Sequence, residues 1–360
     1  MLKNFLYKAM RILVISTAVN DRNGANGSML DVYFALRDIA DTKLAFFARN
    51  KFVGVLEGLM RWGIISFHYS RYTHIESWVP DVVFFISSTP ISVIEQIRSC
   101  YKHCKLIIFQ TGDVKNSCPL MAKKIEKIDK IVFQGIGQLN QFKQYYFSYN
   151  EKSYLLRPTI KERKFGHLTG TVNTRNFLDK RIDICIAGSV QERKNQLLAV
   201  MLVGELKNKF GYDVTLNIVG PIVCPDYKKV LDLYIKESGL FRNVNFAGFR
   251  KDYHKYLVKS DIVLSTSKEE GVSTILRESL FLGKLIVATD IVGNVGTLDS
   301  GNSILINLNN NAEFNSKIIH ENIKNISKVV FLSESARLTY VKYFSEPTFR
   351  ENISGLITSF

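Results

Sequence analysis

Short apolar runs, separated by polar turns and by segments of helical length, recur along most of the chain. Runs of this kind that end in glycine or polar turns are typical of buried strands in a parallel sheet. The expected strands are 10–16, 43–48, 79–86, 105–110, 130–134, 182–187, 214–219, 243–247, 261–264 and 285–288, and the expected helices are 29–39, 51–67, 196–210 and 275–282. Strands that alternate with helices predict an α/β fold with doubly wound domains.

The polar loop after the run 261–264 has the clearest chemical pattern. It carries two carboxylates eight positions apart, Glu270 in the loop and Glu278 on the helix that follows. Carboxylates at this spacing lie about 12 Å apart if the span is helical, which is too far to share a proton. The separation suits a long ligand with polar groups at both ends, such as a nucleotide-sugar. A solvated helix face is the alternative, and for two glutamates taken alone it is the commoner situation.

Two other strand-to-helix turns carry glycine or basic residues. Gly27 lies in a glycine-bearing loop after the first strand, although the spacing is not GxGxxG and Ser28 would serve equally well as a helix N-cap. Arg193 and Lys194 follow the strand that ends at Gly188. A cation beside a helix N-terminus suits a pyrophosphate, so this second turn is a candidate phosphate-binding site.

The length of 360 residues, 46% of them hydrophobic, favours two domains. We expect a first domain at 1–165, a basic linker at 166–180, a second domain at 181–335 and closing helices at 336–360. No apolar run reaches the ~18 residues of a membrane span, and the short apolar run near the N-terminus fits a first strand better than a signal peptide. The 5 cysteines form no CxxC pair, which predicts a reduced, cytoplasmic protein.

The formal net charge of +15 predicts an acidic partner. The basic residues are scattered and form no nucleic-acid-binding signature, so we expect no nucleic acid. An anionic membrane surface is the preferred partner, and the candidate contact is the segment 51–71, where Arg61 and Trp62 border an apolar stripe. A solvated lysine-rich surface accounts for the charge almost as well, and core packing accounts for the stripe.

The order of these blocks resembles the retaining glycosyltransferases of the GT-B fold, especially the large family 4 group. Glu270 and Glu278 match the family's E-x7-E motif, and 286–289 matches the strand that follows it. Three earlier blocks resemble family blocks in the expected order: 217–220, 244–248 and 256–264. The resemblance implies two Rossmann-like domains facing each other across a cleft, the first binding the acceptor and the second the nucleotide-sugar donor. It also implies that the closing helices cross back to the first domain.

The resemblance further implies roles for individual residues. Glu278 is expected to hold the ribose of the nucleotide, Glu270 to hold donor sugar hydroxyls at the catalytic centre, and Lys194 to bind phosphate. Family members often have an arginine directly after the glycine that ends this strand, where the chain has Ser189, so Arg193 is the candidate for that charge. The backbone amides expected to meet the sugar and the phosphate are those of Gly271, Val272, Ser273 and Thr274.

Two departures from the family pattern fall near the expected position of the sugar. The strand that ends near Phe109 often leads to a histidine in the family, whereas here it leads to the residues 110–113. In the turn after Thr289, where another acidic residue is common in the family, residues 291–296 contain none. Both departures are consistent with an unusual donor or a weakened enzyme.

Residues and resemblance together predict a nucleotide-sugar-dependent glycosyltransferase of the hexosyltransferase type. It would act with retention on a saccharide or lipid-linked acceptor in bacterial surface polysaccharide or glycoconjugate synthesis, at the inner face of the membrane. No cofactor is expected, because the nucleotide-sugar is a substrate, and no metal is expected. A GT-B epimerase or phosphorylase and a non-catalytic nucleotide-sugar-binding subunit remain alternatives, whereas a dehydrogenase is disfavoured because GxGxxG is missing.

Overall fold

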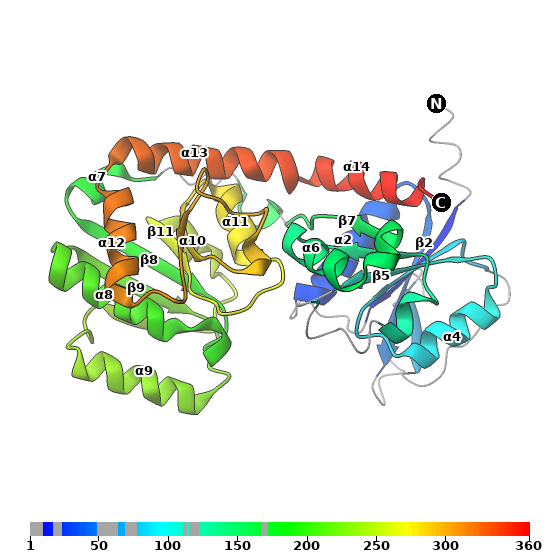
Figure 1. The fold of residues 1–360 in the computed structure, drawn as a ribbon, viewed down its shortest axis with the longest axis horizontal. Coiled ribbons are helices and arrows are strands. Elements are labelled where there is room, and N and C mark those ends of the chain that lie inside the picture. Colours follow the sequence, from blue (N-terminus) through cyan, green and yellow to red (C-terminus); the bar gives the residue numbers. More distant parts are fainter. Residues whose placement is uncertain are drawn as a thin grey trace. The chain divides into compact units, whose positions relative to one another are not determined.

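The computed structural model describes residues 10–16, 24–48, 64–68, 78–110, 114, 122–160, 162–166 and 172–360. The chain forms two compact units, unit 1 with Met1–Thr159 and Glu346–Phe360, and unit 2 with Ile160–Ser345. Each unit is built on a parallel sheet with helices on its faces (Figure 1). The predicted α/β class with two doubly wound, Rossmann-like domains is therefore confirmed.

The described part of unit 1 has a parallel sheet in the order β3-β2-β1-β4-β5-β6-β7. Its elements are β1 (Arg11–Ser16), α2 (Gly24–Leu36), β2 (Asp41–Ala48), β3 (Ile64–His68), β4 (Val82–Ile86), α4 (Ile91–Cys100), β5 (Lys105–Gln110), β6 (Lys130–Phe133), α6 (Ile136–Tyr145), the 3-10 segment η1 (Phe147–Lys152), β7 (Ser153–Leu155) and α14 (Glu346–Ile357). All five side chains of β4 are buried, because helices cover both faces of the sheet. The strand order reverses at β1, between β2 and β4.

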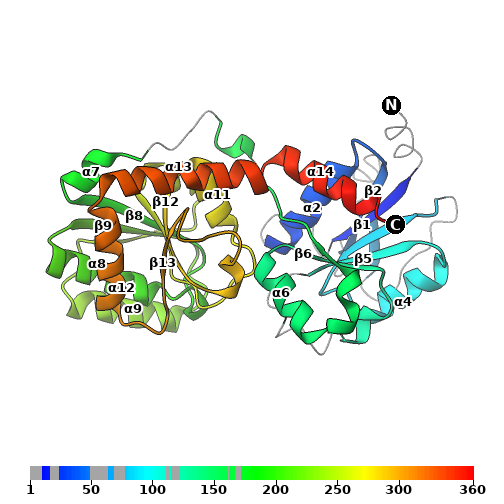
Figure 2. The same cartoon turned by 45° about the horizontal axis from the view of Figure 1, so that its top comes forward.

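Helix α14 belongs to unit 1 because of its apolar stripe. Its buried side chains Phe349, Ile353, Leu356 and Ile357 follow helical spacing and pack in one core with Ile12 of β1. The helix lies alongside α2, as both ribbon views show (Figure 2). The end of the chain thus closes the core of the unit in which the chain begins.

The described part of unit 2 has a parallel sheet in the order β10-β9-β8-β11-β12-β13. Its strands are β8 (Arg181–Ala187), β9 (Asp213–Val219), β10 (Val244–Gly248), β11 (Ile262–Ser265), β12 (Leu285–Thr289) and β13 (Ile304–Ile306). Its α-helices are α7 (Thr174–Leu178), α8 (Gln196–Phe210), α9 (Pro225–Glu237), α10 (His254–Lys259), α11 (Thr274–Leu282), α12 (Ala312–Ile323) and α13 (Ile326–Tyr343), and its 3-10 segments are η2 (Glu162–Lys164), η3 (Glu192–Lys194) and η4 (Val292–Asn294). The strand order reverses at β8.

Alternate side chains of each unit 2 strand enter two different cores, as the period of a strand requires. Ile184 of β8 packs in the core that contains buried residues of α8, α9 and α12. Its neighbour Cys185 packs in the other core, with buried residues of α10, α11 and α13. This double burial explains why Ile262–Leu264 of β11 and Leu285–Ala288 of β12 read as continuous apolar runs in the sequence.

The unit boundaries differ from the predicted limits at 165 and 335. Ile160 and Phe165 are buried in the second core of unit 2, and Phe177, inside the expected linker 166–180, is buried in the first. These side chains bring the start of unit 2 forward to Ile160. Tyr340, likewise buried in unit 2, keeps 336–345 of the expected closing segment there, and the rest, with α14, belongs to unit 1.

Two predicted helices also need correction. The first was expected at 29–39 after a glycine loop, but α2 already begins at Gly24, so Gly27 lies in its first turn. The second was expected at 51–67, of which 51–63 lies outside the described residues. Its last part is instead in β3, which pairs in parallel with β2. The β-branched and aromatic residues of this short run fit a strand, and sheet pairing overrides the weak helical spacing.

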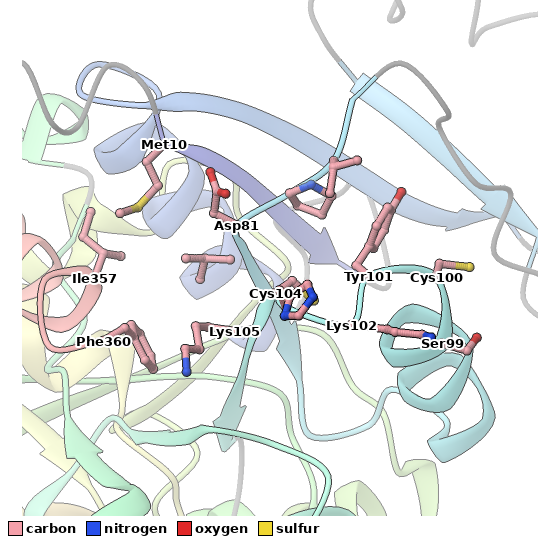
Figure 3. Close-up of a pocket in the computed structure, with 14 residues that line it drawn as sticks. Met10, Asp81, Ser99, Cys100, Tyr101, Lys102, Cys104, Lys105, Ile357 and Phe360 are labelled. Carbon is pink, nitrogen blue, oxygen red and sulfur yellow. The ribbon is translucent and has the colours of Figure 1, made fainter.

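A hollow of about 550 Å³ lies in unit 1 at the amino ends of β4 and β5 (Figure 3). Asp81 and Lys105 lie on its wall with Tyr101 and Phe360. Open α/β sheets bind ligands beyond the carboxyl ends of their strands. The position of this hollow therefore excludes it as the candidate donor site, in spite of its size.

Candidate active site

The candidate site lies in unit 2, where the carboxyl ends of β8 and β11 meet the amino end of α11. These two strands are neighbours in the sheet, and β8 is the strand at which the order reverses. A small hollow between them has room for about one water molecule, at about 10 Å³. Its polar lining includes Gly188, Lys194, Gln196, Ser267 and Ser273. The reversal point of a doubly wound sheet is the expected ligand position.

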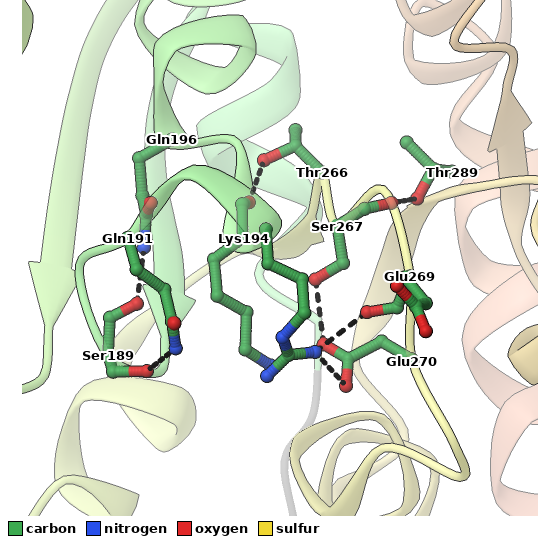
Figure 4. Close-up of polar contacts among 10 residues, drawn as sticks. Ser189, Gln191, Lys194, Gln196, Thr266, Ser267, Glu269, Glu270 and Thr289 are labelled. Carbon is green, nitrogen blue, oxygen red and sulfur yellow. Dashed lines mark hydrogen bonds and ion pairs between the residues drawn. The ribbon is translucent and has the colours of Figure 1, made fainter. Parts of the chain in front are cut away.

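Glu270 is held between two cations and a hydroxyl (Figure 4). Lys194 Nζ donates to Glu270 Oε1, and Arg193 Nη1 lies 3.3 Å from Oε2. Ser267 Oγ donates to Oε1 at 2.7 Å, and Arg193 also donates to the backbone oxygen of Glu269 at 2.7 Å. The structure therefore brings the predicted Glu270 together with the predicted Arg193 and Lys194, which lie 77 and 76 positions earlier in the sequence.

The electrostatics of Glu270 depend on these partners. Its side chain is 10% exposed, and burial alone would raise the pKa of the carboxyl. The charge and hydrogen bond of Lys194, helped by Ser267 and Arg193, outweigh burial, so the pKa of Glu270 is lowered. The carboxylate is therefore ionised at neutral pH and available as a hydrogen-bond acceptor.

Backbone contacts fix the cations relative to the glutamate loop. Thr266 Oγ1 donates to the carbonyl oxygens of Lys194 at 3.1 Å and Asn195 at 2.8 Å, and Lys268 N donates to Arg193 O at 2.9 Å. Thr289 Oγ1 donates to Ser267 O at 2.6 Å. The turn after β8 and the loop after β11 therefore form one hydrogen-bonded unit, which positions the charged side chains before any ligand binds.

Gly293 fixes how closely the turn after β12 packs against the loop that carries Glu270. A Cβ atom at this position would lie 2.2 Å from Glu270 O and 2.3 Å from Gly271 O. Real Cβ contacts are never that close, so the turn after β12 packs directly on the peptide between these two residues. Asn294 Nδ2 holds the turn by donating to Thr289 O at 2.8 Å.

The predicted amide site at 271–274 coincides with the start of α11. Ser273 is the residue before the helix, and its side chain makes no capping hydrogen bond to the described residues. The first N–H groups of an α-helix have no partner inside the helix and favour negative charge. Gly271, Val272, Ser273 and Thr274 are partly exposed, so this helix start is accessible to an anion.

Glu278 lies on the buried side of α11 and does not join the Glu270 cluster. Its side chain is 1% exposed. Tyr253 donates its phenol hydroxyl to Oε1 at 2.7 Å, with Oε2 at 2.9 Å, and Lys164 Nζ lies 3.8 Å from Oε1. Burial raises the pKa of Glu278, and Tyr253, Lys164 and Arg277 oppose the rise.

Several contributors to the site were not assigned from the sequence. Ser267 was part of the recognised loop but was given no role, and Lys164 was placed in the first domain. Tyr253 lies just before the recognised block 256–264, and no sequence pattern marks it. Gln110 is buried at the end of β5, whereas 111–113, the rest of the first departure from the family pattern, lies outside the described residues.

Residues 181–320 match the family model described as glycosyl transferases group 1. The match lies within unit 2, which is similar to a group 1 glycosyltransferase domain. The matched residues contain the cations of η3, the glutamate loop and α11. No curated protein matches the chain by sequence.

Solved structures resemble both units together, at low sequence identity. Anabaena HepE in complex with UDP has a TM-score of 0.78 at 16% identity, over 98% of this chain and 100% of that one. The lipopolysaccharide outer core galactosyltransferase WaaB has a TM-score of 0.73 at 15% identity, over 97% and 99%. A glycosyltransferase from Rickettsia africae has a TM-score of 0.75 at 19% identity, over 97% and 98%. These likenesses show the GT-B fold.

Within the described residues, no helix is both long and apolar enough to cross a membrane. The segment 51–71, the predicted membrane contact, lies outside them except for β3.

Proposed function

We propose that the chain is a retaining, family 4 type glycosyltransferase that moves a hexosyl group from a nucleoside-diphosphate sugar to an acceptor hydroxyl. The observation that carries this proposal is the buried Glu270 carboxylate held by Lys194 and Arg193 at the reversal point of a group 1 domain. HepE has been solved with UDP and with UDP-glucose, so UDP-glucose is the first donor to test.

In the proposed reaction the bond between the anomeric carbon and the pyrophosphate oxygen breaks, and the acceptor oxygen bonds to that carbon on the same face. Negative charge grows on the departing diphosphate. Lys194, Arg193 and the start of α11 supply positive charge where it accumulates, and only charge that develops in the transition state accelerates the reaction. We assign no general base, because in the family that the chain resembles the leaving phosphate takes the acceptor's proton.

Glu270 is assigned to the donor sugar. Its carboxylate accepts hydrogen bonds from sugar hydroxyls and orients the anomeric carbon toward the acceptor. The partly exposed amides of Gly271, Val272, Ser273 and Thr274 are assigned to the sugar and the diphosphate, and Glu278 to the ribose. Gly27, in the first turn of α2, stays a candidate contact to the donor. The KM of a Gly27→Ala variant for the donor tests this assignment.

We further propose that the reaction needs no divalent metal. Metal ions in other transferases offset the charge of the diphosphate, and here two side-chain cations and a helix start are already placed for that task. Activity that survives EDTA is the expected result. Loss of activity that added manganese restores would contradict the proposal.

The acceptor is proposed to be a saccharide or a lipid-linked saccharide of a bacterial surface glycoconjugate, used at the inner face of the membrane. The support is the net charge of +15. Each basic residue near an anionic surface contributes on the order of 1 kcal/mol, so a few suffice for reversible attachment. Co-sedimentation with anionic vesicles that exceeds co-sedimentation with neutral ones is expected, and equal binding would exclude this association.

The deciding experiment offers wild type and Glu270→Ala a panel of nucleotide-sugars with lipid-linked and free saccharide acceptors. Product with the anomeric configuration of the donor, seen by NMR and lost in Glu270→Ala, is the expected result. An inverted product would refute retention. Epimerised nucleotide-sugar or phosphorolysis would identify the enzyme as an epimerase or phosphorylase, and nucleotide-sugar binding without turnover would identify a non-catalytic subunit.

A further inference from the structure

The surroundings of Glu278 are unusual for a carboxylate. The side chain is 1% exposed, yet its polar neighbours are a phenol and one lysine 3.8 Å away. A carboxylate offers about four acceptor positions, and the single proton of Tyr253 fills one of them. Among the described residues no further hydrogen-bond donor reaches the side chain. Acceptor positions therefore remain for two hydroxyl donors, the number that a ribose presents on adjacent carbons.

Lys164 comes from a segment that unit 2 holds firmly. Ile160 and Phe165 are buried in the unit 2 core on either side of it, and Phe165 lies 5.3 Å from Phe281 between ring centroids. Glu162 accepts a hydrogen bond from Tyr340 at 2.5 Å. This anchoring places Lys164 beside Glu278 although the lysine side chain is 40% exposed.

Lys164 and Tyr253 lie close to each other as well as to the carboxylate. The ammonium group is 5.7 Å from the centroid of the Tyr253 ring, a distance at which a cation is attracted to the ring face. Lys164 is exposed and Tyr253 is half-buried, so the lysine is the more exposed of these two partners of the buried Glu278 side chain. We expect a ribose that binds this carboxylate to approach along the lysine side.

We infer that Tyr253 and Lys164 are positioning residues for the nucleotide, which orient Glu278 and keep it ready to accept the two ribose hydroxyls. The inference rests on the proposed function. Tyr253 fixes the direction of the carboxylate with a charge-assisted hydrogen bond. Lys164 balances its charge on the lysine side, where the nucleotide is expected to enter.

A second consequence concerns protonation. A protonated Glu278 would lose an acceptor and bind ribose less well. Burial raises the pKa of this carboxyl, and three residues lower it: Tyr253, Lys164 and, on α11 itself, Arg277. Removal of the Tyr253 hydroxyl therefore makes nucleotide binding more sensitive to acid, which a purely structural role of the phenol would not do.

The test measures binding of a nucleoside diphosphate to the full chain by calorimetry at pH 6, 7 and 8. The probe is whichever of UDP, GDP, ADP and dTDP binds the wild type. The variants are Tyr253→Phe and Lys164→Met. Tyr212→Phe and Arg163→Met are the matched controls. Tyr212→Phe removes a phenol hydroxyl that contacts His320, and Arg163→Met removes the exposed positive charge next to Lys164.

Tyr253→Phe is expected to weaken nucleotide binding roughly tenfold at pH 8, the effect of one hydrogen bond to a charged group, and by a larger factor at pH 6. Lys164→Met is expected to weaken it roughly threefold, since the pair is partly exposed, and Lys164→Arg to restore it. Donor KM rises in both variants while kcat changes little. Because histidine changes charge between about pH 5 and 8, and the ring of His254 lies 6.2 Å from that of Tyr253, the pH series is repeated with His254→Gln.

The outcomes separate the inference from the function. If no diphosphate binds the wild type, the proposed function fails and the inference fails with it. If the wild type binds but Tyr253→Phe and Lys164→Met bind equally well at every pH, the function stands and the inference is overturned. A loss in Tyr253→Phe that is no larger than the loss in the control Tyr212→Phe assigns the phenol to structure alone and overturns it too.

Discussion

Replacement of Glu270 by Gln separates donor binding from turnover. In the unliganded site this carboxylate neutralises part of the charge of Lys194 and Arg193. The diphosphate needs the same cations. Loss of the carboxylate charge therefore makes them more available to a nucleoside diphosphate, whereas the sugar loses its charged hydrogen-bond acceptor.

The magnitude follows from the contact geometry. A carboxylate and a phosphate that share one ammonium group lie about 5 Å apart, and their repulsion is about 3 kcal/mol at an effective dielectric constant of about 20. The Arg193 side chain is 44% exposed, so the site is partly screened. About 1 kcal/mol of relief remains, which is roughly a fivefold gain in affinity for free diphosphate. Turnover should fall about 100-fold, because each hydrogen bond to a charged group contributes about 1.5–3 kcal/mol.

The assay pairs calorimetry with the free diphosphate and steady-state kinetics with the sugar donor. Glu269→Gln is the matched control, because it removes the same charge from an exposed side chain at the adjacent position. Little change is expected there. If Glu270→Gln weakens free diphosphate binding as strongly as Glu278→Gln does, Glu270 binds the nucleotide and its assignment to the sugar is refuted.

Three further variants test the geometry of the site, the pKa of Glu270 and the effect of Glu278 on stability. Gly293→Ala should lower kcat by about 100-fold at nearly unchanged nucleotide affinity, because the added Cβ displaces the loop that carries Glu270. An unchanged kcat would show that catalysis does not depend on the position of this loop. Ser267→Ala removes a hydrogen bond that lowers the pKa of Glu270, so the acidic limb of the kcat profile should move to higher pH and kcat should fall roughly fivefold. Glu278→Gln should raise the melting temperature at pH 8, because burial raises the pKa of Glu278 above its usual 4.5 and the ionised carboxylate therefore destabilises the fold. The gain in melting temperature should shrink as the pH falls toward 4.5, and a gain that grew instead would contradict the upward direction of this pKa shift.

The strands were predictable because parallel sheets covered on both faces leave continuous apolar runs. Val82–Ile86 and Ile262–Leu264 are buried along their whole length, and both lie inside strands that were predicted from apolar runs, at 79–86 and 261–264. The meeting of Lys194 with Glu270 was predictable for a related reason. Each follows the carboxyl end of a strand, and neighbouring parallel strands bring those ends to one edge.

Other features depend on packing that leaves no local signal. The early start of α2 at Gly24 goes against the low helix propensity of glycine, and no pattern in 24–28 predicts it. Gly293 was noticed only as part of an atypical turn, since its close approach to the peptide of Glu270 depends on how two loops pack. Lys164 joined the site because Phe165 beside it is buried in unit 2.

Glu278 shows how a local rule points to function when it fails. Residues Leu276–Leu282 of α11 are all buried, so Glu278 occupies a position where a helix that is buried on every side is expected to carry an apolar residue. Burial raises the pKa of Glu278, so the ionised side chain costs stability at neutral pH. Replacing a buried charge by an apolar residue of similar size is often stabilising. A carboxylate kept at such a position under a phenol and a lysine, with acceptor positions left over, is best explained by a ligand that brings its own hydroxyls.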